Sequence, residues 1–106
     1  MITAYATQRG EKSRLWIEGH ACEGQDRDAV CAGVSALVQS LVLYAVASHA
    51  RRLRYELAPG KAFVSCYGLG RPFEMVLCGL YAIAREHPDH LKIISNVAVD
   101  DKCDRT

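Results

Sequence analysis

A histidine and a cysteine, His20 and Cys31, stand close together in the first third of the chain. An imidazole within reach of a thiol is the minimal apparatus for acyl transfer, because the histidine can take the thiol proton and later donate it to the leaving amine. Asp28 and Ser35 lie three residues before and four residues after the cysteine, so a helix would place all three on one face. The pattern points to nucleophilic catalysis; the alternative is that Cys31 is a small buried hydrophobe of an apolar helix.

Asp28 is expected to be the N-cap of the helix that carries the cysteine, because its carboxylate could accept from the unpaired N–H groups of the first turn. Cys31 would then be the third helical residue, where the positive end of the helix dipole favours a thiolate. His20 would end the preceding strand and return to the thiol through the loop 20–27. The amides expected to stabilise an oxyanion are those nearest the thiol, at Val30, Cys31 and Ala32.

Hydrophobic periodicity predicts seven elements in the order ββαββαβ. The strands are expected at residues 2–7, 14–18, 53–58, 61–67 and 91–99. One long helix follows Asp28 and ends near Arg51 and Arg52, and a second begins at Pro72 and stops before Pro88. The expected fold class is therefore α+β, an antiparallel-rich sheet with two helices packed on one face. The long helix is apolar nearly all round, which favours burial against the second helix or a second subunit.

Length and charge narrow the classes of function. The chain has 106 residues and a net charge of +1, which fits one domain at 1–99 with a polar tail at 100–106, and it gives no reason to expect direct nucleic-acid binding. The apolar stretch 29–47 is interrupted by polar side chains and is expected to fall short of a membrane span. No secretory signal is visible and the five cysteines have no disulfide-like spacing, so a cytoplasmic protein with free thiols is expected.

The run Gly19-His20-Ala21, a loop, and then Asp28-x-Val30-Cys31-Ala32-Gly33-x-Ser35-Ala36 resembles the signature of the ribosomal-processing cysteine proteases, the Prp family. The order ββαββαβ is similar too. The resemblance implies that Cys31 is the nucleophile and His20 the catalytic histidine, with Gly19, Asp28 and Ser35 as accompanying residues. The loop between the two catalytic residues is about one residue shorter than the family's, Asp26 replaces a glycine, and Ala29 replaces an isoleucine.

The same resemblance implies an activity and partners. The activity is endoproteolysis by a bacterial or phage homodimer, without metal or cofactor. The substrate is a peptide segment, the N-terminal extension of the twenty-seventh large-subunit ribosomal protein, removed during ribosome maturation. Phage relatives instead suggest a capsid or scaffolding protein as substrate.

Two other classes of function are open at this stage. A zinc site could use His20, Cys22 and Cys31, although no second pair of closely spaced ligands exists. A non-catalytic dimeric binding module is the other alternative. Cys22 itself is either an idle loop thiol or the partner of Cys31 in a disulfide formed on oxidation.

Overall fold

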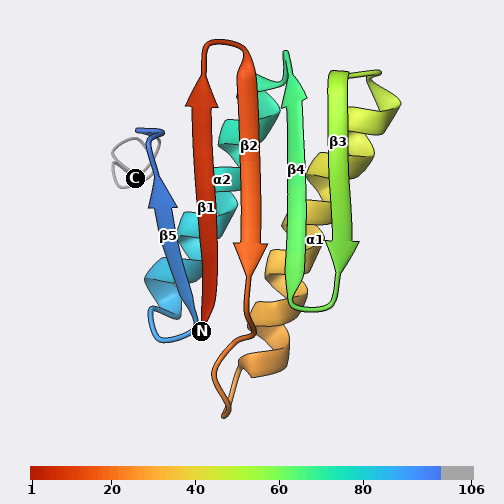
Figure 1. Ribbon diagram of the computed structural model, residues 1–106. Helices are drawn as coiled ribbons and strands as arrows, with labels where there is room; N and C mark the ends of the chain where they lie inside the picture. The colour runs from red at the N-terminus through yellow and green to blue at the C-terminus, as the bar shows by residue number, and fades with distance from the viewer. Residues whose placement is uncertain (99–106) are drawn as a thin grey trace.

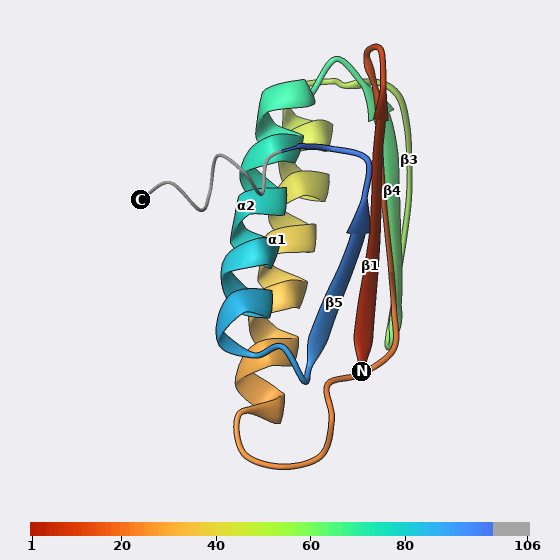
Figure 2. The same ribbon diagram turned by 90° about the vertical axis from the view of Figure 1, so that its left-hand side faces the viewer.

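The computed structural model describes residues 1–98, which form one five-stranded sheet with two helices on one of its faces (Figures 1 and 2). The strand order across the sheet is β3-β4-β2-β1-β5. The predicted α+β class and the order ββαββαβ are confirmed. The elements are β1 (Ile2–Arg9), β2 (Lys12–Glu18), α1 (Arg27–Ala47), β3 (Arg51–Ala58), β4 (Lys61–Tyr67), α2 (Gly70–Glu86) and β5 (Leu91–Ser95).

Two hairpins and one crossover build the sheet. Strands β1 and β2 pair antiparallel, as do β3 and β4, and the two hairpins join through antiparallel pairing of β2 with β4. Strand β5 returns from α2 and adds to β1 in parallel. Because β3 and β5 lie at the edges, each leaves one side of its backbone without a strand partner.

The core lies between the sheet and the helices. Alternate residues of the central strands point toward the helix layer, and Ala4, Leu15 and Val64 are each at most 2% exposed. Phe73 and Leu77 of α2 are equally buried against them. The apolar faces of the strands and of the helices therefore pack together in one layer. This packing holds α1 over the helix-facing side of the β3–β4 hairpin.

The start of α1 differs from the prediction. Asp26, in a left-handed conformation with φ 72°, is the N-cap, and its side chain makes no capping hydrogen bond. The backbone closes the turn instead: the Arg27 N–H donates to the Gly24 carbonyl at 3.4 Å and the Val30 N–H to the Asp26 carbonyl at 2.9 Å. The prediction of Asp28 as N-cap is therefore wrong, because the helix already begins at Arg27, whose N–H donates to a backbone carbonyl and not to a carboxylate.

The end of α1 also comes earlier than predicted, at Ala47. His49 adopts φ 54°, its N–H donates to the Val46 carbonyl, and the Ala50 N–H donates to the Ala45 carbonyl at 2.9 Å. This pair of bonds is a Schellman motif with histidine in the place usually taken by glycine. Arg51 and Arg52, expected at the helix end, therefore begin β3.

Helix α1 is long and apolar enough, by length and composition alone, to cross a membrane, which the polar interruptions did not lead us to expect. A core helix passes the same test, and six residues of α1 are buried in this fold. Leu43, Tyr44 and Val46 are exposed by 68%, 53% and 48%. The second helix thus covers only part of the apolar surface of α1.

Strand β5 ends at Ser95, earlier than the predicted Val99. The Asn96 side chain ends the pairing, since its Oδ1 accepts from the Gln8 N–H at 2.9 Å and its Nδ2 donates to the Gln8 carbonyl at 3.2 Å. Val99 and the tail 100–106 lie outside the described residues, so the domain boundary at residue 99 stays a prediction.

Candidate active site

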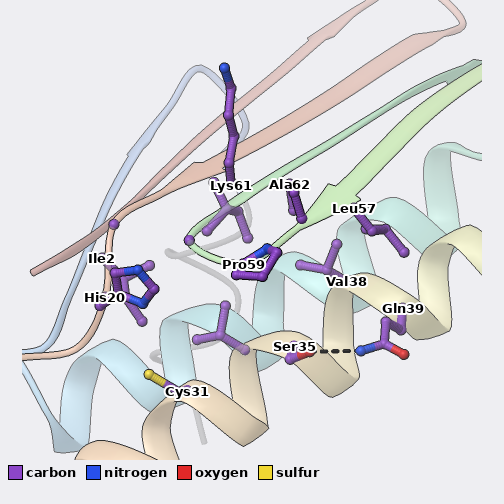
Figure 3. Close-up of a pocket in the computed structure, with 15 residues that line it drawn as sticks. Ile2, His20, Cys31, Ser35, Val38, Gln39, Leu57, Pro59, Lys61 and Ala62 are labelled. Carbon is purple, nitrogen blue, oxygen red and sulfur yellow. Dashed lines mark hydrogen bonds between the residues drawn. The ribbon is translucent and has the colours of Figure 1, made fainter.

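A cavity of about 450 Å³ lies between α1 and the β3–β4 hairpin, and it brings together the two residues that the sequence singled out (Figure 3). The thiol of Cys31 comes from α1, and the imidazole of His20 comes from the segment that follows β2. Most of the remaining wall is apolar: Ile2, Ile17, Val34, Val38, Leu57 and Ala62. The cavity therefore joins a thiol and an imidazole to an apolar surface.

Cys31 is half-buried and lies at the fifth position of α1, two positions further in than expected. The helix dipole acts mainly within the first turn, so its support for a thiolate is smaller here than at the third position. The unpaired amides of a helix belong to its first four positions, and the Val30 N–H already donates to Asp26. The expectation that the amides of Val30, Cys31 and Ala32 are free oxyanion donors is therefore wrong for the conformation seen here.

His20 is positioned by two glycines. Gly19 has φ 99°, and a Cβ added there would overlap the carbonyl oxygen of Met1, so this turn after β2 requires glycine. The Gly19 N–H donates to the Gly60 carbonyl at 2.9 Å. The imidazole then lies against Gly60, where an added Cβ would stand 2.5 Å from its Nε2. The β3–β4 turn is thus the surface on which His20 rests.

The imidazole of His20 and the sulfur of Cys31 lie at the same end of the cavity (Figure 3). Within residues 1–98, no hydrogen bond joins them. Catalytic hydrogen bonds are often long in a free enzyme and tighten when substrate binds. The two groups are therefore assembled in one pocket, and the proton transfer between them requires a closer approach.

The two accompanying polar residues are placed differently. Ser35 lines the cavity, and its hydroxyl accepts from the Gln39 Nε2 at 2.7 Å. Asp28 is exposed and does not line the cavity. Figure 2 shows why: the first turn of α1 extends beyond the end of the sheet, so no hairpin faces it. Ser35 therefore lines the same cavity as Cys31, whereas Asp28 lies outside this cavity.

The sequence missed the opposite wall of the pocket. Pro59 and Gly60 were interpreted only as a turn, yet they face α1 across the cavity. The position of this wall depends on the pairing of β2 with β4, which aligns Glu18 with Lys61 and so brings the β3–β4 turn beside Gly19. Nothing in the local sequence specifies that pairing.

The third soft ligand of the zinc alternative, Cys22, does not line the cavity. Its Sγ donates to the Asp89 carbonyl at 3.0 Å, and its side chain is exposed. Among the described residues, no three His, Cys, Asp or Glu side chains gather as a metal-binding group. The structure therefore gives neither a zinc site nor a pairing of Cys22 with Cys31 any geometric support.

Comparisons with known proteins give a family match and solved structures of similar fold. The family described as cysteine protease Prp matches residues 1–92. A crystal structure of an essential ribosomal processing protease Prp from S. aureus, in complex with a substrate peptide, superposes with a TM-score of 0.76 at 22% identity, covering 91% of this chain and 100% of that one. SMU.848 from Streptococcus mutans superposes with a TM-score of 0.67 at 24% identity, covering 90% and 96%.

No curated protein gives a significant match. The two structural likenesses establish the fold, and the family match extends over β1 to α2, the first two residues of β5 and all the residues that line the pocket. The chain belongs to the Prp family of cysteine proteases.

Proposed function

We propose that this protein is an endopeptidase in which Cys31 is the nucleophile and His20 is the general base and acid. The observation that carries the proposal is that the two residues line one pocket although they come from different elements. A non-catalytic binding module would not require this meeting, and the family is one of proteases.

The proposed reaction follows from the chemistry of the pair. His20 takes the proton of the Cys31 thiol, and the sulfur attacks the carbonyl carbon of the scissile peptide bond. The C–N bond breaks, the leaving amine takes the proton from the imidazolium, and a thioester remains on Cys31. Water, deprotonated by the same imidazole, then attacks the thioester, and the thiolate leaves with the new carboxylate as the other product.

The shape of the site favours an extended peptide with an apolar side chain next to the scissile bond. Val38 of α1 and Leu57 of β3 form apolar walls on either side of the cavity. Strand β3 is an edge strand, so its free backbone groups can pair with an extended chain. Such a substrate has to be unfolded at the cleavage point, as a terminal extension is.

We propose as substrate the N-terminal extension of the twenty-seventh large-subunit ribosomal protein, removed during ribosome maturation in the cytoplasm. The motif from Gly19 to Ala36 supports this assignment, and so does the fold shared with a ribosomal processing protease that was crystallised with a substrate peptide.

Mass spectrometry of the extended ribosomal protein after incubation with the enzyme tests the substrate assignment. One cut that leaves the mature N-terminus is expected, and the already mature protein should stay intact. If the extended protein also stays intact while a phage capsid or scaffolding protein is cut, the ribosomal substrate is wrong and the phage alternative replaces it.

We also propose a homodimer that uses the exposed apolar part of α1. Leu43 is exposed by 68% beside Tyr44 and Val46, and an apolar helix face of this kind usually packs against a partner. Sedimentation of Leu43→Glu should show a shift from dimer to monomer. Met75→Glu is the matched control, because Met75 of α2 is exposed by 71%; a monomeric wild-type protein would contradict the proposal.

A further inference from the structure

The two helices leave one face of the sheet uncovered (Figure 2). This face, called the open face below, carries most of the basic side chains of the strands. Strand registers and side-chain contacts place seven basic side chains there: Arg9, Lys12, Arg14, Arg52, Arg54, Lys61 and Lys92. Only two acidic residues of the strands, Glu18 and Glu56, share it. The chain as a whole has a net charge of +1, so the rest of the molecule is net acidic. The near-neutral total therefore hides an excess of positive charge on the open face.

A row of large side chains crosses the middle of the same face. The registers align Ile94 with Tyr5, Tyr5 with Trp16, and Trp16 with Phe63. Tyr5 and Trp16 are exposed by 38% and 40%, and their ring centroids are 6.0 Å apart. Since neighbouring strands lie about 4.8 Å apart, the row forms an apolar strip across four strands, in which the planes of the Tyr5 and Trp16 rings are tilted by 51°.

Cations lie directly over aromatic rings at the border of this strip. The Arg14 guanidinium is 5.5 Å from the ring centroid of Phe63, and the Arg52 guanidinium is 5.5 Å from that of Tyr67. Apolar rings and positive charges are therefore interleaved on the open face and are not separated into an apolar patch and a charged rim.

This combination argues against a second copy of the chain as the occupant. Two open faces brought together would oppose like charges, which costs association energy. A partner with regularly spaced negative charges and flat apolar groups fits both features, and single-stranded nucleic acid has phosphates and unpaired bases. A duplex has its base faces hidden in the stack and could use only the charges.

We propose that the open face binds single-stranded RNA, with bases stacked on Tyr5 and Trp16 and phosphates held by the surrounding Arg and Lys side chains. The choice of RNA rests on the proposed function, because a ribosomal-protein substrate brings the enzyme beside RNA. The expectation of no direct nucleic-acid contact came from the net charge, which averages over the whole chain, and from residue spacing, which does not show which side chains neighbouring strands bring together. The open face lies on the side of the sheet opposite the helices, so RNA and peptide can be bound together.

Trp16 is the only tryptophan in the chain, which gives the proposal a direct readout. Fluorescence of the wild-type protein is titrated with a single-stranded oligouridine of about 12 nucleotides, within the range of site sizes for such surfaces, and with a duplex RNA of equal length. Quenching by the single strand is expected, with an affinity that falls as salt is raised, and the duplex should quench little. Absence of quenching at low salt, or equal quenching by the duplex, would overturn the proposal.

Two variants test whether RNA binding depends on the open face and not on positive charge anywhere on the surface. Anisotropy of labelled oligouridine should show at least about fivefold weaker binding for Arg54→Glu and for Trp16→Ala, as expected from loss of one phosphate contact or one stacking partner. Arg71→Glu is the matched control: Arg71 is exposed at the start of α2, on the helix side, and its reversal should leave the affinity nearly unchanged. Equal losses for Arg54→Glu and Arg71→Glu would contradict a specific face.

Two further probes test the class of the partner. A Glu-rich peptide and vesicles containing anionic lipid should bind more weakly than oligouridine at the same salt concentration, because neither offers bases for the aromatic row. Stronger binding of either one would overturn the assignment to RNA. Since none of these measurements involves cleavage, loss of RNA binding and loss of protease activity are distinguished. A short peptide substrate should be cut equally well by Trp16→Ala and wild type, because Trp16 lies in the central strand β2 and does not line the cavity.

Discussion

The contact between His20 and Gly60 shows how far the proposed general base depends on a residue remote in sequence. The imidazole is exposed to solvent and has no hydrogen bond within residues 1–98 that would orient it, so packing against the β3–β4 turn is what restricts its position. A side chain at position 60 would occupy the place of Nε2. The orientation of the base is therefore a property of two loops together.

Gly60→Ala should lower kcat/KM for peptide cleavage by about ten- to a hundredfold, because a displacement of order 1 Å at a reacting group can have an effect of that size. The matched control is Gly10→Ala in the β1–β2 turn. Gly10 has a similar left-handed conformation, φ 59° against 72°, but an added Cβ there meets nothing within 4 Å. Equal activity of the two variants would show that the contact with His20 has no catalytic importance.

The elements were largely predictable from periodicity, and the errors lie at their ends. Alternation in β1 and β2 and the helical stripe of α2 predicted these elements because each buries one face against the common core. The predicted ends of α1 were wrong because Asp26 and His49 adopt left-handed conformations that nothing in their residue types requires. Likewise, the presence of His20 and Cys31 in one pocket was predictable from the motif, whereas the wall formed by the β3–β4 turn depends on long-range strand pairing.

Leu77→Ala in α2 should lower the free energy of unfolding by about 2–5 kcal/mol, the usual cost of removing a fully buried leucine. Leu77 is 0% exposed between the sheet and α1. Met75→Ala, in the same helix with 71% of Met75 exposed, should change it by less than about 0.5 kcal/mol. Urea denaturation followed by circular dichroism measures both, and similar losses for the two variants would contradict the assignment of the core.

On the scale of the whole molecule, the two faces of the sheet carry different properties. The helix side holds the core, the pocket lined by His20 and Cys31, and the exposed apolar part of α1. The other side holds the basic and aromatic surface. The proposed peptide-binding and RNA-binding surfaces therefore lie largely on opposite sides of the sheet and meet at Lys61, which also lines the pocket.

The buried thiol of Cys66 should make global stability sensitive to alkaline pH. Burial raises the pKa of this thiol above its ordinary value, so the unfolded chain loses the proton at a lower pH than the native protein does. Its contribution to stability is complete below about pH 8.5 and is lost as pH rises toward the raised pKa of the folded state. The difference in melting temperature between wild type and Cys66→Ala should therefore shrink between about pH 8 and pH 10; a constant difference would contradict this.

Cleavage of a peptide that spans the extension site, followed by mass spectrometry, tests the central claim most directly. Wild type, Cys31→Ser, His20→Ala and the control Cys22→Ser are compared, with circular dichroism to confirm that each is folded. We expect one cut by wild type and by Cys22→Ser, and no detectable cut by Cys31→Ser or His20→Ala. Undiminished cleavage by either of the latter two would contradict the assignment of this pocket as the active site.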